Sequence, residues 1–182
     1  DALLQTPGGF NLLYWAAREH PEYGIISAVM PQVGNLNQQP QNTGLREDPR
    51  MVCFVAAYIP RTTIKSLAML EQDSRAWCQQ GPPGLLDERY VDYGLDDDDY
   101  CLRIRQAGLK IGIHDGCVVD HGTLQSSFRA DTNAMDFKPN MKRFIEKWGH
   151  DNFGLGKEKS PWMARQDDKR ASSVANAKRK QK

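Results

Sequence analysis

The 182-residue sequence lacks several features that would define its class at once. It has no apolar run near the ~20 residues of a transmembrane helix, so we exclude a membrane span. Its four cysteines form no CxxC pair, which argues against a zinc ribbon or a redox motif. It also has no internal repeat and no Gly-rich phosphate loop. With 40% hydrophobic and 26% charged residues, it has enough apolar side chains for the core of one ordinary domain.

Net charge is also nearly absent, at +1, but the charges are unevenly distributed. Residues 165–182 hold seven Lys or Arg and two Asp, whereas residues 87–99 hold seven carboxylates and one Arg. A mildly acidic body with a basic end is a poor candidate for a nucleic-acid binder. We therefore expect one domain over residues 1–162 and a basic, disordered tail over 163–182. Such a tail favours a solubilising role, and peripheral contact with an anionic membrane is the alternative.

The cysteines and the first residue indicate the context of the chain. Cys53, Cys101 and Cys117 lie among apolar neighbours, as reduced core cysteines do, which favours a reducing compartment and hence a cytoplasmic location. The sequence starts at Asp1 without a signal segment. We expect the numbering to begin inside a longer gene product.

Apolar periodicity predicts alternating helices and buried strands, the pattern of an α/β protein. The predicted helices cover residues 10–20, 63–70, 97–107 and 137–148, the first of them capped by Thr6. The predicted strands cover residues 24–29, 50–59 and 110–120, with a turn at Gly116 dividing the last into two. Residues 31–50 are polar and aperiodic, which predicts a long surface loop.

The most unusual feature is the run of four adjacent carboxylates from Asp96 to Asp99. Like charges at this spacing repel, and a helix N-terminus offsets part of the cost through its free N–H groups and dipole. A purely structural role as an acidic helix start is one explanation. Calcium binding is a weaker alternative, because the spacing of a calcium loop is absent.

The segments around this run resemble the inverting family 2 glycosyltransferases of the GT-A fold. An LDE turn at residues 86–88 precedes YGLDDDD at 93–99, then LRIRQAGLK at 102–110 and a strand that ends in VVDHG. RMVCFVAAYIPR at 50–61 resembles the family's preceding strand. The resemblance implies a mixed, mainly parallel sheet flanked by helices, namely the C-terminal portion of a GT-A domain without its N-terminal nucleotide-binding half.

The resemblance also implies a reaction and a set of site residues. A sugar would pass with inversion from a nucleotide-diphosphate donor to a hydroxyl of a glycan or similar acceptor. Asp97 would be the catalytic base, with Asp96 as the competing assignment, since a carboxylate suits removal of the hydroxyl proton. Mn²⁺ or Mg²⁺ would neutralise the leaving diphosphate. Asp1 and His121 would be its ligands.

Contacts with substrate or acceptor are assigned to Asn35, Asn37, Arg61 and Asp99. The two amides suit sugar hydroxyls, although a solvated loop also explains them. Asp96 and Asp99 alternatively shape the site or cap the helix. A second class of function stays open, a non-catalytic carbohydrate-binding or interaction module derived from the same fold.

Overall fold

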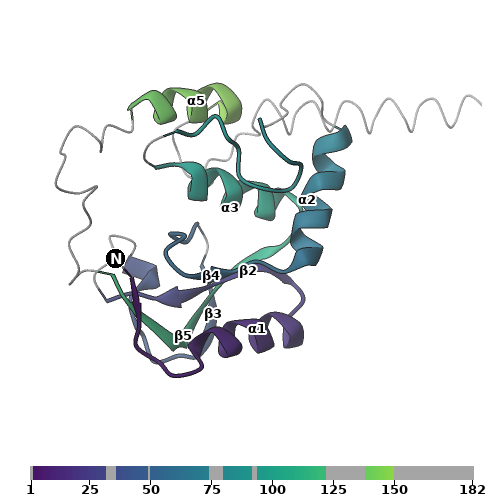
Figure 1. The fold of residues 1–182 in the computed structure, drawn as a ribbon. Helices are drawn as coiled ribbons and strands as arrows, with labels where there is room; N and C mark the ends of the chain where they lie inside the picture. Colours follow the sequence, from purple (N-terminus) through teal and green to yellow (C-terminus); the bar gives the residue numbers. More distant parts are fainter. Residues whose placement is uncertain are drawn as a thin grey trace, which may run out of the picture.

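The computed structural model describes residues 2–31, 36–48, 50–73, 80–91, 94–121 and 138–149, which form a mixed α/β fold (Figure 1). The strands are β1 (Leu3–Leu4), β2 (Tyr23–Val29), β3 (Leu45–Glu47), β4 (Ala57–Tyr58) and β5 (Lys110–Asp120). The helices are α1 (Gly9–Glu19), the short 3₁₀ turn η1 (Leu36–Gln38), α2 (Arg61–Asp73), α3 (Asp96–Gln106) and α5 (Lys138–Trp148). None of the helices in these ranges is long and apolar enough to cross a membrane.

The sheet is built around the two long strands β2 and β5. The strand order is β1-β5-β2-β4, and β3 pairs with β5 at the edge shared with β1. Of the four pairings among the described strands, only β2 with β5 is parallel. The expected mainly parallel sheet is therefore wrong, because the three short strands run against their neighbours.

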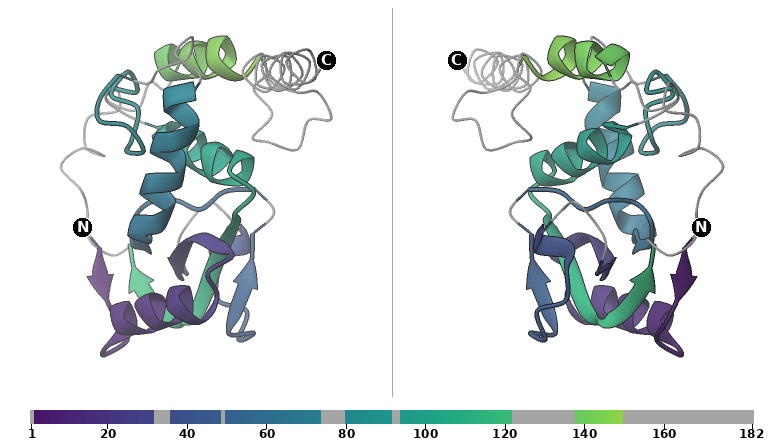
Figure 2. Two further views of the ribbon diagram at one scale, coloured as in Figure 1. Left: turned by 90° about the vertical axis from the view of Figure 1, so that its right-hand side faces the viewer. Right: turned by 90° about the vertical axis from the view of Figure 1, so that its left-hand side faces the viewer.

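The helices cover both faces of the sheet, and α5 adds a further layer (Figures 1 and 2). On one face α1 packs Leu13, Ala16 and Ala17 against alternate residues of β2. The other face packs against α2 and α3. α5 lies on the side of α3 away from the sheet and packs through Phe144 and Trp148. Because both faces are covered, every residue of β2 is buried.

The helices and β2 match their predictions, whereas the other two predicted strand segments do not. α1, α2, α3, α5 and β2 form over the predicted segments to within a few residues at their ends. Thr6 does not cap α1: its hydroxyl accepts a hydrogen bond from the Val118 amide, and Gly8 stands at the N-cap. Residues 110–120 form one strand rather than two, with an irregularity beside Gly116.

The predicted strand over residues 50–59 is reduced to the two residues of β4. Gln38, a fully buried side chain of η1, explains the difference. Its amide oxygen accepts from the Cys53 N–H at 2.8 Å, and its amide nitrogen donates to the Cys53 carbonyl at 3.1 Å and to the Ser27 hydroxyl at 2.7 Å. The side-chain amide thus occupies the place that a neighbouring strand would take.

Candidate active site

The acidic run forms the first turn of α3, which begins at Asp96, one residue before the predicted start at Asp97. The two residues before it are both left-handed, Gly94 at φ 85° and Leu95 at φ 73°. Positive φ is unfavourable for leucine, and such conformations persist only where the surroundings impose them. The sharp turn at Gly94 and Leu95 determines where the side chains of Asp96–Asp99 point.

Helix α5 holds this turn in place. Leu95 is buried against Phe144 and Trp148. The buried Asn140 side chain donates to the carbonyls of Val91 and Gly94 at 2.7 and 3.0 Å and accepts from the Val91 N–H at 3.3 Å. These contacts account for the left-handed backbone, since an apolar anchor and three hydrogen bonds oppose its relaxation.

Asp99 belongs to a buried ion-pair cluster rather than to an open site. Its carboxylate is fully buried and lies 2.7 Å from the Lys147 ammonium and 3.1 Å from Nε of Arg103. The Trp148 indole N–H donates to it at 2.9 Å. Lys147 also contacts Asp87 at 3.0 Å. Asp99 cannot reach a ligand from this position, and its contacts favour the alternative that it shapes the site.

Asp87 has the same environment as Asp99. The Arg89 guanidinium donates to both of its carboxylate oxygens. Burial raises the pKa of Asp87, but the hydrogen bonds from Arg89 and the charge of Lys147 outweigh burial and hold this pKa well below its usual range. We call the six side chains of this network the ion-pair cluster: Glu71, Asp87, Arg89, Asp99, Arg103 and Lys147.

Asp97 and Asp98 lie in the opposite electrostatic environment. Asp97 is half-buried and Asp98 is buried. Among the described side chains, no Lys, Arg or His forms an ion pair with Asp96, Asp97 or Asp98. Burial, followed by the charge of Asp96, raises the pKa of Asp97. A partly accessible carboxylate with a raised pKa is suited to accept a proton near neutral pH.

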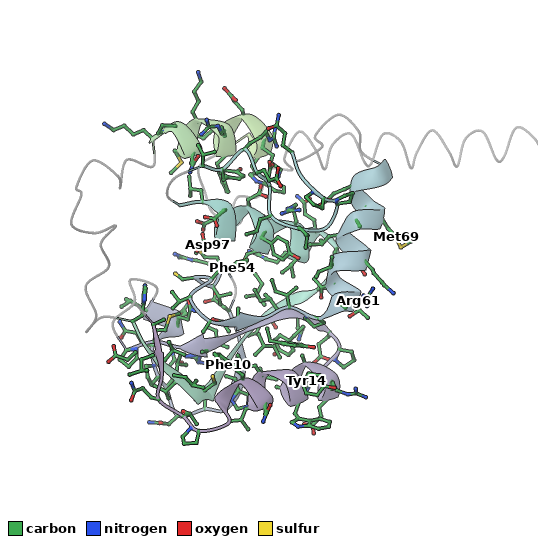
Figure 3. All side chains as sticks on the ribbon, in the orientation of Figure 1. Phe10, Tyr14, Phe54, Arg61, Met69 and Asp97 are labelled. Carbon is green, nitrogen blue, oxygen red and sulfur yellow. The ribbon has the colours of Figure 1, made fainter. Side chains whose placement is uncertain are left out.

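Residues 50–56, the segment that Gln38 holds through Cys53, face the acidic first turn of α3 and separate it from the sheet. The Cys101 thiol of α3 contacts the Val52 carbonyl at 3.9 Å, and Phe54 packs edge-on against Tyr100. Figure 3 shows Phe54 beside Asp97. Burial raises the pKa of the intervening Cys53 thiol to about 12, with the charges of Asp97 and Asp98 adding to the effect. This cysteine is therefore a neutral side chain at ordinary pH and not a nucleophile.

The predicted metal ligands are only partly described. His121 follows the last residue of β5 and is half-buried. Because Leu3 of β1 pairs with Asp120, the sheet brings His121 to the strand that follows Asp1 in sequence. Asp1 itself lies outside the described residues. Within the described ranges, no group of three His, Cys, Asp or Glu side chains could hold a metal ion.

The predicted substrate residues are not brought to the acidic turn as a group. Arg61 is exposed at the start of α2, and Figure 3 places it across the molecule from Asp97. Asn37 is half-buried in η1, next to Gln38, and Asn35 lies outside the described residues. The structure thus groups Asp96 and Asp97 but separates Arg61 from them.

Sequence reasoning missed three residues that build the site, namely Gln38, Asn140 and Lys147. Each is a polar side chain that is at most 4% exposed. Gln38 is one of five Asn or Gln side chains between residues 37 and 42, and nothing in the local pattern distinguishes it. The tryptophan next to Lys147 is the one local sequence signal that this part of α5 faces the core, and Trp148 is indeed buried.

Comparisons with protein-family models, with curated proteins and with solved structures find no match for this chain. The resemblance to family 2 glycosyltransferases therefore rests on the motifs of the sequence. What the structure adds is the arrangement of those motifs, above all the acidic turn between α5 and the segment over residues 50–56.

Proposed function

We propose that this protein transfers a sugar from a nucleotide-diphosphate donor to a hydroxyl acceptor with inversion, using Asp97 as the general base. The supporting observation is the state of Asp97, a half-buried carboxylate that has no cation partner among the described side chains and lies on a turn that α5 holds. A base must be ionised and still attract a proton strongly, which is what burial without a cation provides.

In the proposed step, the acceptor oxygen forms a bond to the anomeric carbon while the bond from that carbon to the diphosphate oxygen breaks. The proton of the acceptor hydroxyl passes to the Asp97 carboxylate, and the diphosphate leaves with the electron pair. Fixed geometry at Asp97 matters here because a general base must lie within hydrogen-bond reach of the proton that it removes. The left-handed turn at Gly94 and Leu95 supplies such a fixed position.

A divalent metal, Mn²⁺ or Mg²⁺, would neutralise charge on the leaving diphosphate. The donor types of Asp1 and His121 suit Mn²⁺, which takes carboxylate and imidazole ligands. The described residues alone do not make a metal centre, so no step of the proposal passes through the metal.

The test is a sugar-transfer screen on the full gene product, with and without Mn²⁺, over a set of nucleotide-sugars. We expect Asp97→Asn to lower turnover about 100-fold or more, because a general base contributes 10²–10⁴-fold. Asp96→Asn tests the competing assignment, and Glu146→Gln on the exposed side of α5 is the charge-matched control. Near wild-type turnover in Asp97→Asn would show that Asp97 is not the base.

One observation favours the second candidate, a carbohydrate-binding module. On α1, Phe10 and Trp15 are exposed by 55% and 56%, and Tyr14 packs edge-on against Trp15. Figure 3 shows Phe10 and Tyr14 on this helix. Exposed aromatic groups of this kind often mark binding surfaces. If binding without transfer is the function, Trp15→Ala abolishes oligosaccharide binding and Asp97→Asn leaves it intact. An active enzyme shows the loss of turnover in Asp97→Asn instead.

A further inference from the structure

Asp98 is a buried carboxylate for which the proposed reaction has no role. The residue is only 6% exposed, and its Oδ1 is buried with no hydrogen-bond partner. Its backbone N–H donates to Oδ1 of Asp97 at 2.9 Å, so the two residues are locked side by side. Burial of an ionised carboxylate in this state is costly unless something neutralises it.

Among the described residues, the groups that face Asp98 do not neutralise it. On α3 its ionisable neighbours are three further aspartates and the Cys101 thiol, and Asp99 is already paired with Lys147 and Arg103. The described ionisable groups of the facing segment are Asp48, Arg50 and the Cys53 thiol. The Asp48 carboxylate accepts backbone N–H groups of the same segment. Arg50 is exposed, and its carbonyl accepts a hydrogen bond from Arg105 near the C-terminal end of α3. Apart from Arg50, every group in this set is acidic or neutral.

Two adjacent buried carboxyl groups without a cation cannot both ionise at moderate pH, because the second negative charge is opposed by burial and by the first. One proton therefore stays in the pair. Consistent with this, burial raises the pKa of Asp98, and the charge of Asp97 raises it further. The Asp98 backbone N–H holds Oδ1 of Asp97 at 2.9 Å, so the two carboxyl groups stay adjacent while the proton is retained.

We infer that Asp97 and Asp98 form a proton-sharing carboxyl pair, in which Asp98 keeps the proton and positions Asp97 as the single ionised base. The inference extends the proposed function by assigning Asp98 a positioning role for the Asp97 base. The protonation state of the pair, however, does not depend on which reaction the protein catalyses.

The test measures protonation directly, by ¹³C-carboxyl NMR of the full chain labelled in aspartate, from pH 4 to pH 9. We expect wild type to show two separated titration steps for the pair, the upper step lying above the ordinary carboxyl range. Asp98→Asn and Asp97→Asn should each leave one step and remove the upper one. Asn has the shape of Asp and still donates a hydrogen bond, so both variants should fold.

Three results would overturn the inference. Wild type could lack the upper step, the step could persist in both variants, or it could vanish in only one of them, which would assign it to one residue alone. Asp115→Asn is the control, since that carboxylate belongs to β5, accepts hydrogen bonds from the Thr43 backbone N–H and hydroxyl, and should leave the pair unchanged.

A second readout connects the pair to catalysis. In an active preparation, the acidic limb of the rate profile should move to a different pH in Asp98→Asn, whereas a merely structural role would change the amplitude and not the position of this limb. The NMR result stands even where no transfer activity is found, so failure of the proposed function and failure of the proton-sharing pair are distinguishable.

Discussion

The first turn of α3 carries two carboxylate regions that are adjacent in sequence and opposite in environment. Asp99 points into the ion-pair cluster, where Lys147 and Arg103 neutralise it. Asp98 and Asp97, one and two residues earlier, are buried and half-buried, and neither has such a partner among the described side chains. Because successive residues of a helix point about 100° apart, one acidic run can serve two faces. We infer that the acidic run has two roles. Asp99 belongs to the ion-pair cluster, which anchors the first turn of α3, whereas Asp97 and Asp98 form the reactive pair.

Helix α5 contributes to both regions. From α5, Lys147 and Trp148 contact Asp99, and Asn140 fixes the turn that precedes Asp96. The anchor therefore determines where the reactive carboxylates lie. Damage to the ion-pair cluster should destabilise the protein strongly, whereas changes in the reactive pair should alter chemistry and pH dependence with little loss of stability.

The largest effect is expected from Lys147→Met, which keeps the length of the side chain but removes its charge. Asp87 and Asp99 then remain buried with fewer cations, and breaking a buried pair costs about 3–5 kcal/mol. Urea unfolding at pH 7 measures the loss of free energy of unfolding. Lys142→Met, at an exposed position of the same helix, should change it by less than about 0.5 kcal/mol. Equal effects of the two variants would contradict the role of the ion-pair cluster.

A smaller effect is expected from Asn140→Ala. The variant leaves the N–H of Val91 and the carbonyls of Val91 and Gly94 without this partner, at about 1–3 kcal/mol for buried groups. It should also loosen the acidic turn without touching any carboxylate. Hydrogen exchange of the amides at residues 94–97 measures this loosening. If exchange there stays at the wild-type rate while stability falls, Asn140 supports only the packing of α5.

The two regions also differ in how much the sequence foretold. α3 was predicted within one residue at either end, because its apolar spacing and acidic first turn are local signals. The grouping of Asp96 with Asp97 follows from that helix alone. The partner of Asp99 does not, since Lys147 lies 48 residues away on a helix whose periodicity marks only its apolar residues. Burial of a lysine depends on carboxylates that local patterns cannot locate.

The same limit explains the error at residues 50–59. Their apolar run predicts a strand, and the prediction is sound for the local composition. Whether such a run pairs as a strand depends on what lies beside it. Here the side chain of Gln38 bonds Cys53 in place of a strand backbone. One buried amide in a polar loop thus decides the conformation of the segment that faces Asp97.

The smallest effect concerns pH, where the two regions should act with opposite sign. The pKa of Asp87 is lowered in the folded state, so its stabilising contribution is present above the unfolded pKa near 4 and is lost as the pH falls below it. The pKa of Asp98 is raised, so the folded state binds more protons than the unfolded state above pH ~4, and stability falls as the pH rises. Removing the Asp98 carboxyl group should therefore stabilise the protein at pH 8 by about 1 kcal/mol and have little effect at pH 4. Urea unfolding of Asp98→Asn at the two pH values checks this. A variant that is less stable at pH 8 than wild type would mean that Asp98 is neutralised by a partner and belongs with the anchor.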